Sequence, residues 1–187
     1  KDVPVLLDAK RADIGNTTRQ YAEILDEVDA ITVNPYMGHD SLQPFLDRAE
    51  KGVFVLCRTS NPGRTDFQDL ELDADGGKLY ERVADRAVAW NEHNNVGLVV
   101  GATGPEELEA IRDRVPSLPF LVPGVGAQGG DAKAAVEHGL NENGVGRVNS
   151  SRGIIFAGED NGEAFADAAG GSAKQLKQRL NQYRGDE

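Results

Sequence analysis

The feature that most constrains the fold is a repeated alternation between short apolar runs and amphipathic segments. Six runs are apolar over nearly their whole length, which is typical of parallel strands covered on both faces. They span residues 3–7, 30–33, 53–57, 96–100, 120–122 and 145–148. The segments between them carry apolar residues at helical spacing, as in Leu42, Phe45, Leu46 and Ala49. The pattern predicts an α/β fold of about six βα units with no linker.

Six βα units can form either an open doubly wound sheet or most of a (β/α)8 barrel. A complete barrel usually needs ~250 residues, whereas this chain has 187. The chain also begins without methionine and enters an apolar run almost at once. We therefore expect the natural N-terminus to be missing, and two further βα units would add roughly 60 residues.

Composition narrows the class of protein further. The chain is 39% hydrophobic and 27% charged, as expected for one globular domain with a core. No apolar run approaches the ~18 residues of a membrane span, and a single cysteine favours a cytoplasmic location. The net charge of −11 argues against nucleic acid as a partner. The acidic surface, with more arginine than lysine, also suits a high-salt cytoplasm.

A charged cluster follows the first apolar run. Asp8 and Lys10 are two residues apart, so in a strand they point to the same side, and Asp13 follows in the loop before a helix that begins near Thr17. The carboxyl ends of parallel strands are where such folds place their ligand sites. A structural alternative is that Lys10 pairs with Asp8 while Asp13 or Asn16 caps the helix. The clustering of three charges together with the sites below favours a catalytic interpretation.

Two later features indicate a phosphate site. The segment LVPGVGAQGGD, residues 121–131, matches GxGxxG between a strand and a helix, with four glycines in seven positions. A dinucleotide site also requires an acidic residue at the end of the next strand, and that strand instead ends in VNSSRG. A glycine-rich loop before a helix suits a single phosphate, and Arg152 can grip phosphate through two nitrogens. A surface salt bridge is the alternative for Arg152.

The segment CRTSNPG, residues 57–63, opens the long loop after the third apolar run. Thr59 and Ser60 offer hydroxyls to a ligand there. Cys57 has no nearby His–Asp pair, so we expect it to pack rather than to act as a nucleophile. The three histidines are far apart in sequence, which makes a zinc or iron site unexpected.

Together these motifs resemble the orotidine 5′-phosphate decarboxylase family. DAKRADIGNT, residues 8–17, is similar to the family signature DxKxxD-I-x-N-T. Four other segments are similar to the longer bacterial and archaeal subgroup: TVNPYMGHDSLQPFL, LCRTSNPG, LVPGVGAQGGD and NSSRGI. The resemblance covers essentially the whole chain in the right order. DxKxxD alone is less specific, since sugar-phosphate decarboxylases and aldolases of the same superfamily share it.

The resemblance implies a (β/α)8 TIM-barrel homodimer that converts orotidine 5′-monophosphate to uridine 5′-monophosphate in pyrimidine synthesis, with no metal and no organic cofactor. It makes Lys10 the proton donor to C6 of the pyrimidine and places Asp8 beside the leaving carboxylate. Asp13 and Thr17 would reach across the dimer interface toward the ribose in the partner's site. Ser60 would bind the pyrimidine.

At the phosphate end, the resemblance assigns Pro123 to a closing loop and gives Gln128 and Arg152 the phosphate. Ser151 belongs to the same substrate-binding set. In this interpretation the buried Lys10 stays charged because Asp8 and Asp13 oppose its desolvation.

The resemblance also implies what the chain lacks. Residues 1–187 would be one barrel domain without its first two βα units, so the third to eighth are present. The first two strands of the family supply an acidic residue for the ribose and a second lysine. We therefore expect the chain alone to be inactive. The alternatives are a Mg²⁺-dependent sugar-phosphate decarboxylase or aldolase of the same superfamily, and a non-catalytic nucleotide- or phosphate-binding fragment.

Overall fold

A computed structural model describes residues 3–72, 77–102, 104–125, 131–158 and 164–184. Its main feature is a six-stranded parallel sheet in the order β1-β2-β3-β6-β7-β8. The strands are β1 (Leu6–Arg11), β2 (Ala30–Val33), β3 (Gly52–Arg58), β6 (Val96–Val100), β7 (Phe120–Pro123) and β8 (Gly146–Asn149). The sequence prediction of six parallel strands is confirmed. An antiparallel hairpin of β4 (Glu71–Leu72) and β5 (Gly77–Lys78), which the sequence analysis did not predict, lies in the loop after β3.

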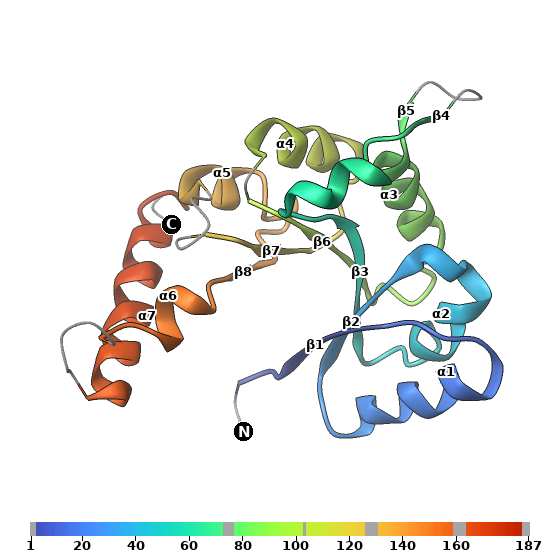
Figure 1. Ribbon diagram of the computed structural model, residues 1–187, viewed down its shortest axis with the longest axis horizontal. Coiled ribbons are helices and arrows are strands. Elements are labelled where there is room, and N and C mark those ends of the chain that lie inside the picture. The colour runs from blue at the N-terminus through green and yellow to red at the C-terminus, as the bar shows by residue number, and fades with distance from the viewer. Residues whose placement is uncertain (1–2, 73–76, 103, 126–130, 159–163, 185–187) are drawn as a thin grey trace.

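Helices line the outer side of the curved sheet, and the opposite side is open between β1 and β8 (Figure 1). The helices are α1 (Gly15–Ala22), α2 (His39–Leu46), α3 (Leu79–Ala89), α4 (Pro105–Arg114), α5 (Ala132–Glu137), α6 (Arg152–Ile155) and α7 (Phe165–Asn181). Short 3₁₀ helices cover Glu23–Asp26, Pro35–Met37 and Pro62–Asp66. Because each parallel strand is followed by a crossover to the same side, the sheet forms an incomplete barrel. No helix in the described ranges has the length and apolarity to cross a membrane.

The two faces of the sheet carry two separate apolar clusters. Outward side chains such as Ile31, Val53 and Leu98 pack against the helices and are fully buried. The inward cluster consists of Ala30, Phe54, Val99 and Leu121, with Leu6 and Leu56 packed against it. Since both faces bury apolar side chains, the strands read as continuous apolar runs. The inward cluster forms the apolar floor of the concave face.

Gly97 on β6 allows the inward cluster to pack closely. A Cβ atom at this position would lie 2.6 Å from Cε1 of Phe54 and 2.7 Å from the carbonyl oxygen of Pro119. Contacts that short do not occur between real side chains, so any substitution would push the Phe54 ring away from the sheet. The absence of a side chain at Gly97 therefore leaves room for the Phe54 ring on the floor of the concave face.

The first strand lies later in the chain than the sequence predicted. The apolar run indicated residues 3–7, whereas β1 covers Leu6–Arg11 and includes the charged residues. Pairing with β2 determines this position: Leu6 is opposite Ala30, and the Asn34 amide donates to the Arg11 carbonyl at 2.9 Å. Asp8 and Lys10 thus stand on a strand, next to the second strand of the sheet.

Candidate active site

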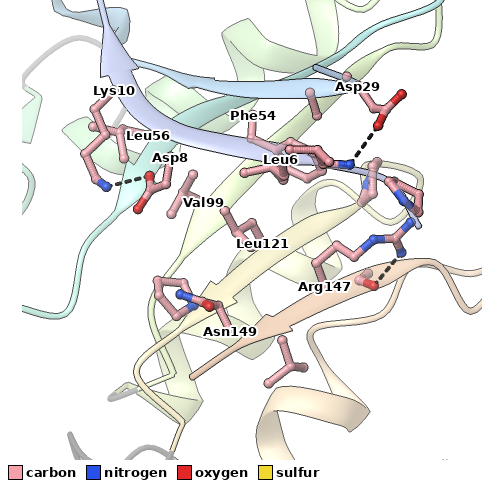
Figure 2. Close-up of a pocket in the computed structure, with 18 of the residues that line it drawn as sticks. Leu6, Asp8, Lys10, Asp29, Phe54, Leu56, Val99, Leu121, Arg147 and Asn149 are labelled. Carbon is pink, nitrogen blue, oxygen red and sulfur yellow. Dashed lines mark hydrogen bonds and ion pairs between the residues drawn. The ribbon is translucent and has the colours of Figure 1, made fainter. Parts of the chain in front are cut away.

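The concave face of the sheet encloses a cavity of about 870 Å³. Its floor is the inward apolar cluster, and Asp8 and Lys10 lie at one end, with Asp29 and Arg147 at the other (Figure 2). Thr59, Ser60, Pro123, Asn149 and Ser151 also line it. These residues follow or end β3, β7 and β8, so together with Asp8 and Lys10 they form a polar rim at the carboxyl ends of the strands, while Asp29 and Arg147 belong to a second polar rim at the amino ends. An apolar floor with a polar edge suits a ligand that has both a ring and a charged group.

Lys10 and Asp8 form an ion pair inside this cavity. The Lys10 Nζ atom lies 2.5 Å from Oδ1 of Asp8. The two side chains are 48% and 52% exposed. The expectation that Lys10 is buried in a dry site is therefore wrong for this chain, because the open concave face leaves the pair in contact with solvent.

A third residue, Thr32 on β2, joins the pair from the neighbouring strand. Its Oγ1 atom donates to Oδ1 of Asp8 at 2.8 Å and accepts from the Lys10 backbone amide at 2.9 Å. Thr32 is completely buried. The sequence analysis did not identify this residue, although it is the one polar side chain in the run AITV.

The loop after β3 is held by polar contacts on both sides of Ser60. The Gln68 side chain accepts from the Thr59 amide at 2.9 Å and donates to its hydroxyl at 2.8 Å. Just before the loop, the buried Arg58 guanidinium lies 3.1 Å from Asp69 and 3.2 Å from Glu107. These contacts tie the loop to α4, so Ser60 is presented on a fixed backbone at the cavity edge.

The expected phosphate residues are only partly placed. Pro123 and Ser151 line the cavity, and Gly124 adopts a left-handed backbone with φ of 95° that favours glycine. Gln128 and most of the glycine-rich loop lie outside the described residues. Arg152 is exposed as the first residue of α6, directly after Ser151, and is not among the residues that line the cavity.

Asp13 and Thr17 do not contribute to this cavity. Neither residue lines it, although both follow β1 closely. Oδ1 of Asp13 accepts from the Ile14 amide at 2.8 Å, and Thr17 is exposed on α1. Asp8 is thus the acidic partner of Lys10 in this structure. The expected second carboxylate is not in contact with the ammonium.

Cys57 packs inside the outer core, as the sequence predicted. Its thiol is 3.2 Å from the Tyr80 carbonyl oxygen, and burial raises its pKa to about 12. A thiol with so high a pKa is not a nucleophile at neutral pH. Within the ranges that the structure describes, no cluster of three histidine, cysteine or acidic residues is arranged to hold a metal ion.

Comparison with known proteins identifies the family. The family model described as orotidine 5′-phosphate decarboxylase / HUMPS family matches residues 1–167. The chain belongs to this family. The curated orotidine 5′-phosphate decarboxylase of Halorubrum lacusprofundi is 71% identical over 194 residues, which cover 98% of this chain and 70% of that protein. The corresponding protein of Dehalococcoides mccartyi strain CBDB1 is 51% identical over 190 residues, covering 98% and 70%.

Solved structures of the family share the fold. Leishmania donovani OMP decarboxylase superposes with a TM-score of 0.84 at 44% identity, covering 97% of this chain and 69% of that chain. The decarboxylase of Methanocaldococcus jannaschii complexed with the inhibitor BMP gives a TM-score of 0.73 at 29% identity, covering 95% and 74%. The predicted fold class, a (β/α)8 barrel of which six units are present, is therefore confirmed. These relatives do not favour the sugar-phosphate lyase alternative.

Proposed function

We propose that the complete barrel containing this chain binds orotidine 5′-monophosphate on its concave face and decarboxylates it to uridine 5′-monophosphate, with Lys10 as the proton donor. The observation that carries this proposal is the Lys10–Asp8 ion pair at the polar end of a cavity with an apolar floor. Family membership supports the reaction. A nucleotide has a flat ring, which suits the apolar floor of this cavity, and a dianionic phosphate, which suits its polar edge.

Loss of CO2 from C6 of the pyrimidine leaves a carbanion with little resonance stabilisation. The barrier is therefore mainly electrostatic, and a fixed ammonium at C6 lowers it. The Lys10 ammonium supplies this charge and then donates its proton to C6. Asp8 holds the ammonium by its 2.5 Å contact and, in this proposal, lies beside the departing carboxylate.

The remaining substrate residues divide between the ring and the phosphate. Ser60, which lines the cavity, is assigned to the pyrimidine. Pro123, Gln128, Ser151 and Arg152 are assigned to the phosphate end of the nucleotide. Because the phosphate is far from C6, its binding energy serves to orient the ring over Lys10.

We also propose that residues 1–187 are one barrel domain that requires two further βα units to work. An eight-stranded barrel closes on itself, whereas this sheet ends at β1 and β8. The chain covers 70% of the Halorubrum lacusprofundi protein, which supports this proposal. Closure would cover the concave face and remove water from the Lys10–Asp8 pair, which strengthens its electrostatic effect.

A spectroscopic assay of orotidine 5′-monophosphate loss tests the function. We expect turnover by a longer polypeptide that carries two preceding βα units, and no turnover by the 187-residue chain. Turnover should be unchanged by EDTA, because the proposed chemistry uses the Lys10 ammonium rather than a metal. Robust turnover by the chain alone would contradict the need for closure. EDTA-sensitive turnover of a sugar phosphate would instead support the lyase alternative.

We further propose a homodimer in which Asp13 and Thr17 serve the partner's site. Neither residue lines the cavity of its own chain. Ile14, Tyr36 and Phe67, in the segments that follow the adjacent strands β1, β2 and β3, are 61%, 80% and 58% exposed, and the rings of Tyr36 and Phe67 lie 6.3 Å apart. Exposed apolar side chains of this size are typical of an interface between protein chains.

Mixing two inactive variants tests this arrangement. In the complete barrel, Lys10→Ala and Asp13→Ala are each expected to lose activity as homodimers. Hybrid dimers would contain one site with both residues intact, so random reassociation should restore about a quarter of wild-type activity. The control is each variant reassociated with itself. A mixture no more active than its components would place Asp13 in the site of its own chain.

A further inference from the structure

Thr32 makes two hydrogen bonds that meet at the catalytic pair. Its hydroxyl lies 2.8 Å from Oδ1 of Asp8 and 2.9 Å from the backbone nitrogen of Lys10. Thr32 is fully buried and does not line the cavity. Any influence of Thr32 on a bound nucleotide must therefore pass through Asp8 and Lys10.

The direction of both hydrogen bonds follows from chemistry. A backbone amide can only donate, and an ionised carboxylate can only accept. The Thr32 oxygen therefore accepts a hydrogen bond from the Lys10 amide, and the Thr32 hydroxyl donates its one hydrogen bond to Asp8. Oδ1 of Asp8 then receives two donors, the Thr32 hydroxyl and the Lys10 ammonium, and the carboxylate is fixed between them.

The backbone at Lys10 explains why this support is needed. Lys10 has φ of 49°, in the left-handed region that residues with a side chain rarely adopt. The register between β1 and β2 shifts between Leu7 and Arg11, so the regular ladder is interrupted around Lys10. The Thr32 hydroxyl accepts from the Lys10 amide at this point, which stabilises the turned backbone that directs the lysine side chain.

We propose that Thr32 is a positioning residue that sets the direction of both the Asp8 carboxylate and the Lys10 ammonium toward the reacting carbon. This inference rests on the proposed function. Its single hydroxyl couples the backbone of one catalytic residue to the side chain of the other. Removing the hydroxyl releases both groups at once while leaving the Ser60 and phosphate ends of the cavity in place.

Steady-state kinetics of the complete barrel test the proposal with Thr32→Val, which keeps the shape of the side chain but removes the hydroxyl. We expect kcat to fall roughly 10- to 100-fold with KM changed less than about threefold, because only the geometry at C6 is disturbed. Thr32→Ser should restore kcat to within about threefold of wild type.

Thr18→Val is the matched control. Thr18 is also a buried threonine, and its hydroxyl donates to the Ser41 carbonyl at 2.7 Å, away from the catalytic pair. Thr18→Val should lower the free energy of unfolding about as much as Thr32→Val does, but it should not lower kcat. If Thr18→Val lowered kcat as much as Thr32→Val, or if Thr32→Ser were as impaired as Thr32→Val, the hydroxyl would not have the proposed role.

Amide hydrogen exchange at Lys10 in the 187-residue chain gives a readout that needs no activity. The exchange should accelerate at least about tenfold in Thr32→Val, and stay near wild type in Thr32→Ser and Thr18→Val. Unchanged exchange in Thr32→Val would overturn this inference while leaving the proposed function intact. Absence of turnover in the wild-type complete barrel would instead overturn the proposed function.

Discussion

Lys10→Ala is expected to reduce the rate of orotidine 5′-monophosphate decarboxylation by at least about 10⁴-fold in the complete barrel. The substitution removes both the positive charge that stabilises the C6 carbanion and the proton that quenches it. It also leaves the Asp8 carboxylate without its 2.5 Å partner, beside the position proposed for the substrate carboxylate. The measurement is kcat by the change in absorbance of the pyrimidine.

Binding of the product distinguishes a chemical role for Lys10 from a structural one. Uridine 5′-monophosphate has no carboxylate at C6, and in the proposed arrangement Ser60 and Arg152, not Lys10, hold its ring and phosphate. Calorimetry should therefore give a dissociation constant for Lys10→Ala within about tenfold of wild type, a change of ~1.4 kcal/mol. Lys174→Ala, on the exposed side of α7, is the control that removes an ammonium elsewhere.

Substantial turnover in Lys10→Ala would show that another group protonates C6. Loss of product binding together with activity would instead indicate that Lys10 holds the fold or the nucleotide. Both outcomes are separable from misfolding, because urea unfolding of the variant should match that of Lys174→Ala.

The fold could be predicted because the apolar sequence of most strands indicates that both of their faces are buried. Val96–Val100 is apolar throughout and Ala30–Val33 is apolar except for Thr32, and the structure buries both strands on both faces. The end of the first strand could not be predicted in this way. Asp8 and Lys10 interrupt the apolar pattern, yet they belong to β1 because the hydrogen bonds come from β2, which is far away in sequence.

The site was predictable where a motif is local and unpredictable where it depends on a neighbour. The contact between Asp8 and Lys10 followed from their spacing. Thr32 is 24 residues from Asp8, and only the strand register brings the two together. The burial of Lys10 was predicted wrongly because exposure depends on what covers the concave face. In our proposal the roles of Asp13 and Thr17 depend on a second chain, which no local pattern reveals.

The largest expected effect on stability is at Arg112, on α4. Its guanidinium donates to five backbone carbonyls, those of Val115, Pro116, Leu118, His138 and Gly139, at 2.9–3.4 Å. It also lies 3.6 Å from the centre of the Phe120 ring. Burial lowers the pKa of Arg112 to about 10, so it remains charged at neutral pH. One side chain thus connects the ends of α4 and α5 to β7.

Arg112→Met is expected to lower the free energy of unfolding by about 3–5 kcal/mol, because five carbonyls lose a charged donor and three of these hydrogen bonds are buried. Urea denaturation of the 187-residue chain measures this loss. Arg114→Met is the matched control on the same helix. Arg114 pairs with Asp85 at 2.6 Å but is 43% exposed, so its removal should cost only about 0–1 kcal/mol.

The two arginines also differ in their expected response to salt. The Arg114–Asp85 pair is exposed and is screened by ions, whereas the Arg112 contacts are direct hydrogen bonds to carbonyls, three of them buried. Raising the salt concentration should therefore shrink the small effect of Arg114→Met and leave that of Arg112→Met nearly unchanged. A cost below about 1 kcal/mol for Arg112→Met would mean that water reaches the five carbonyls, and that the helices do not depend on this residue.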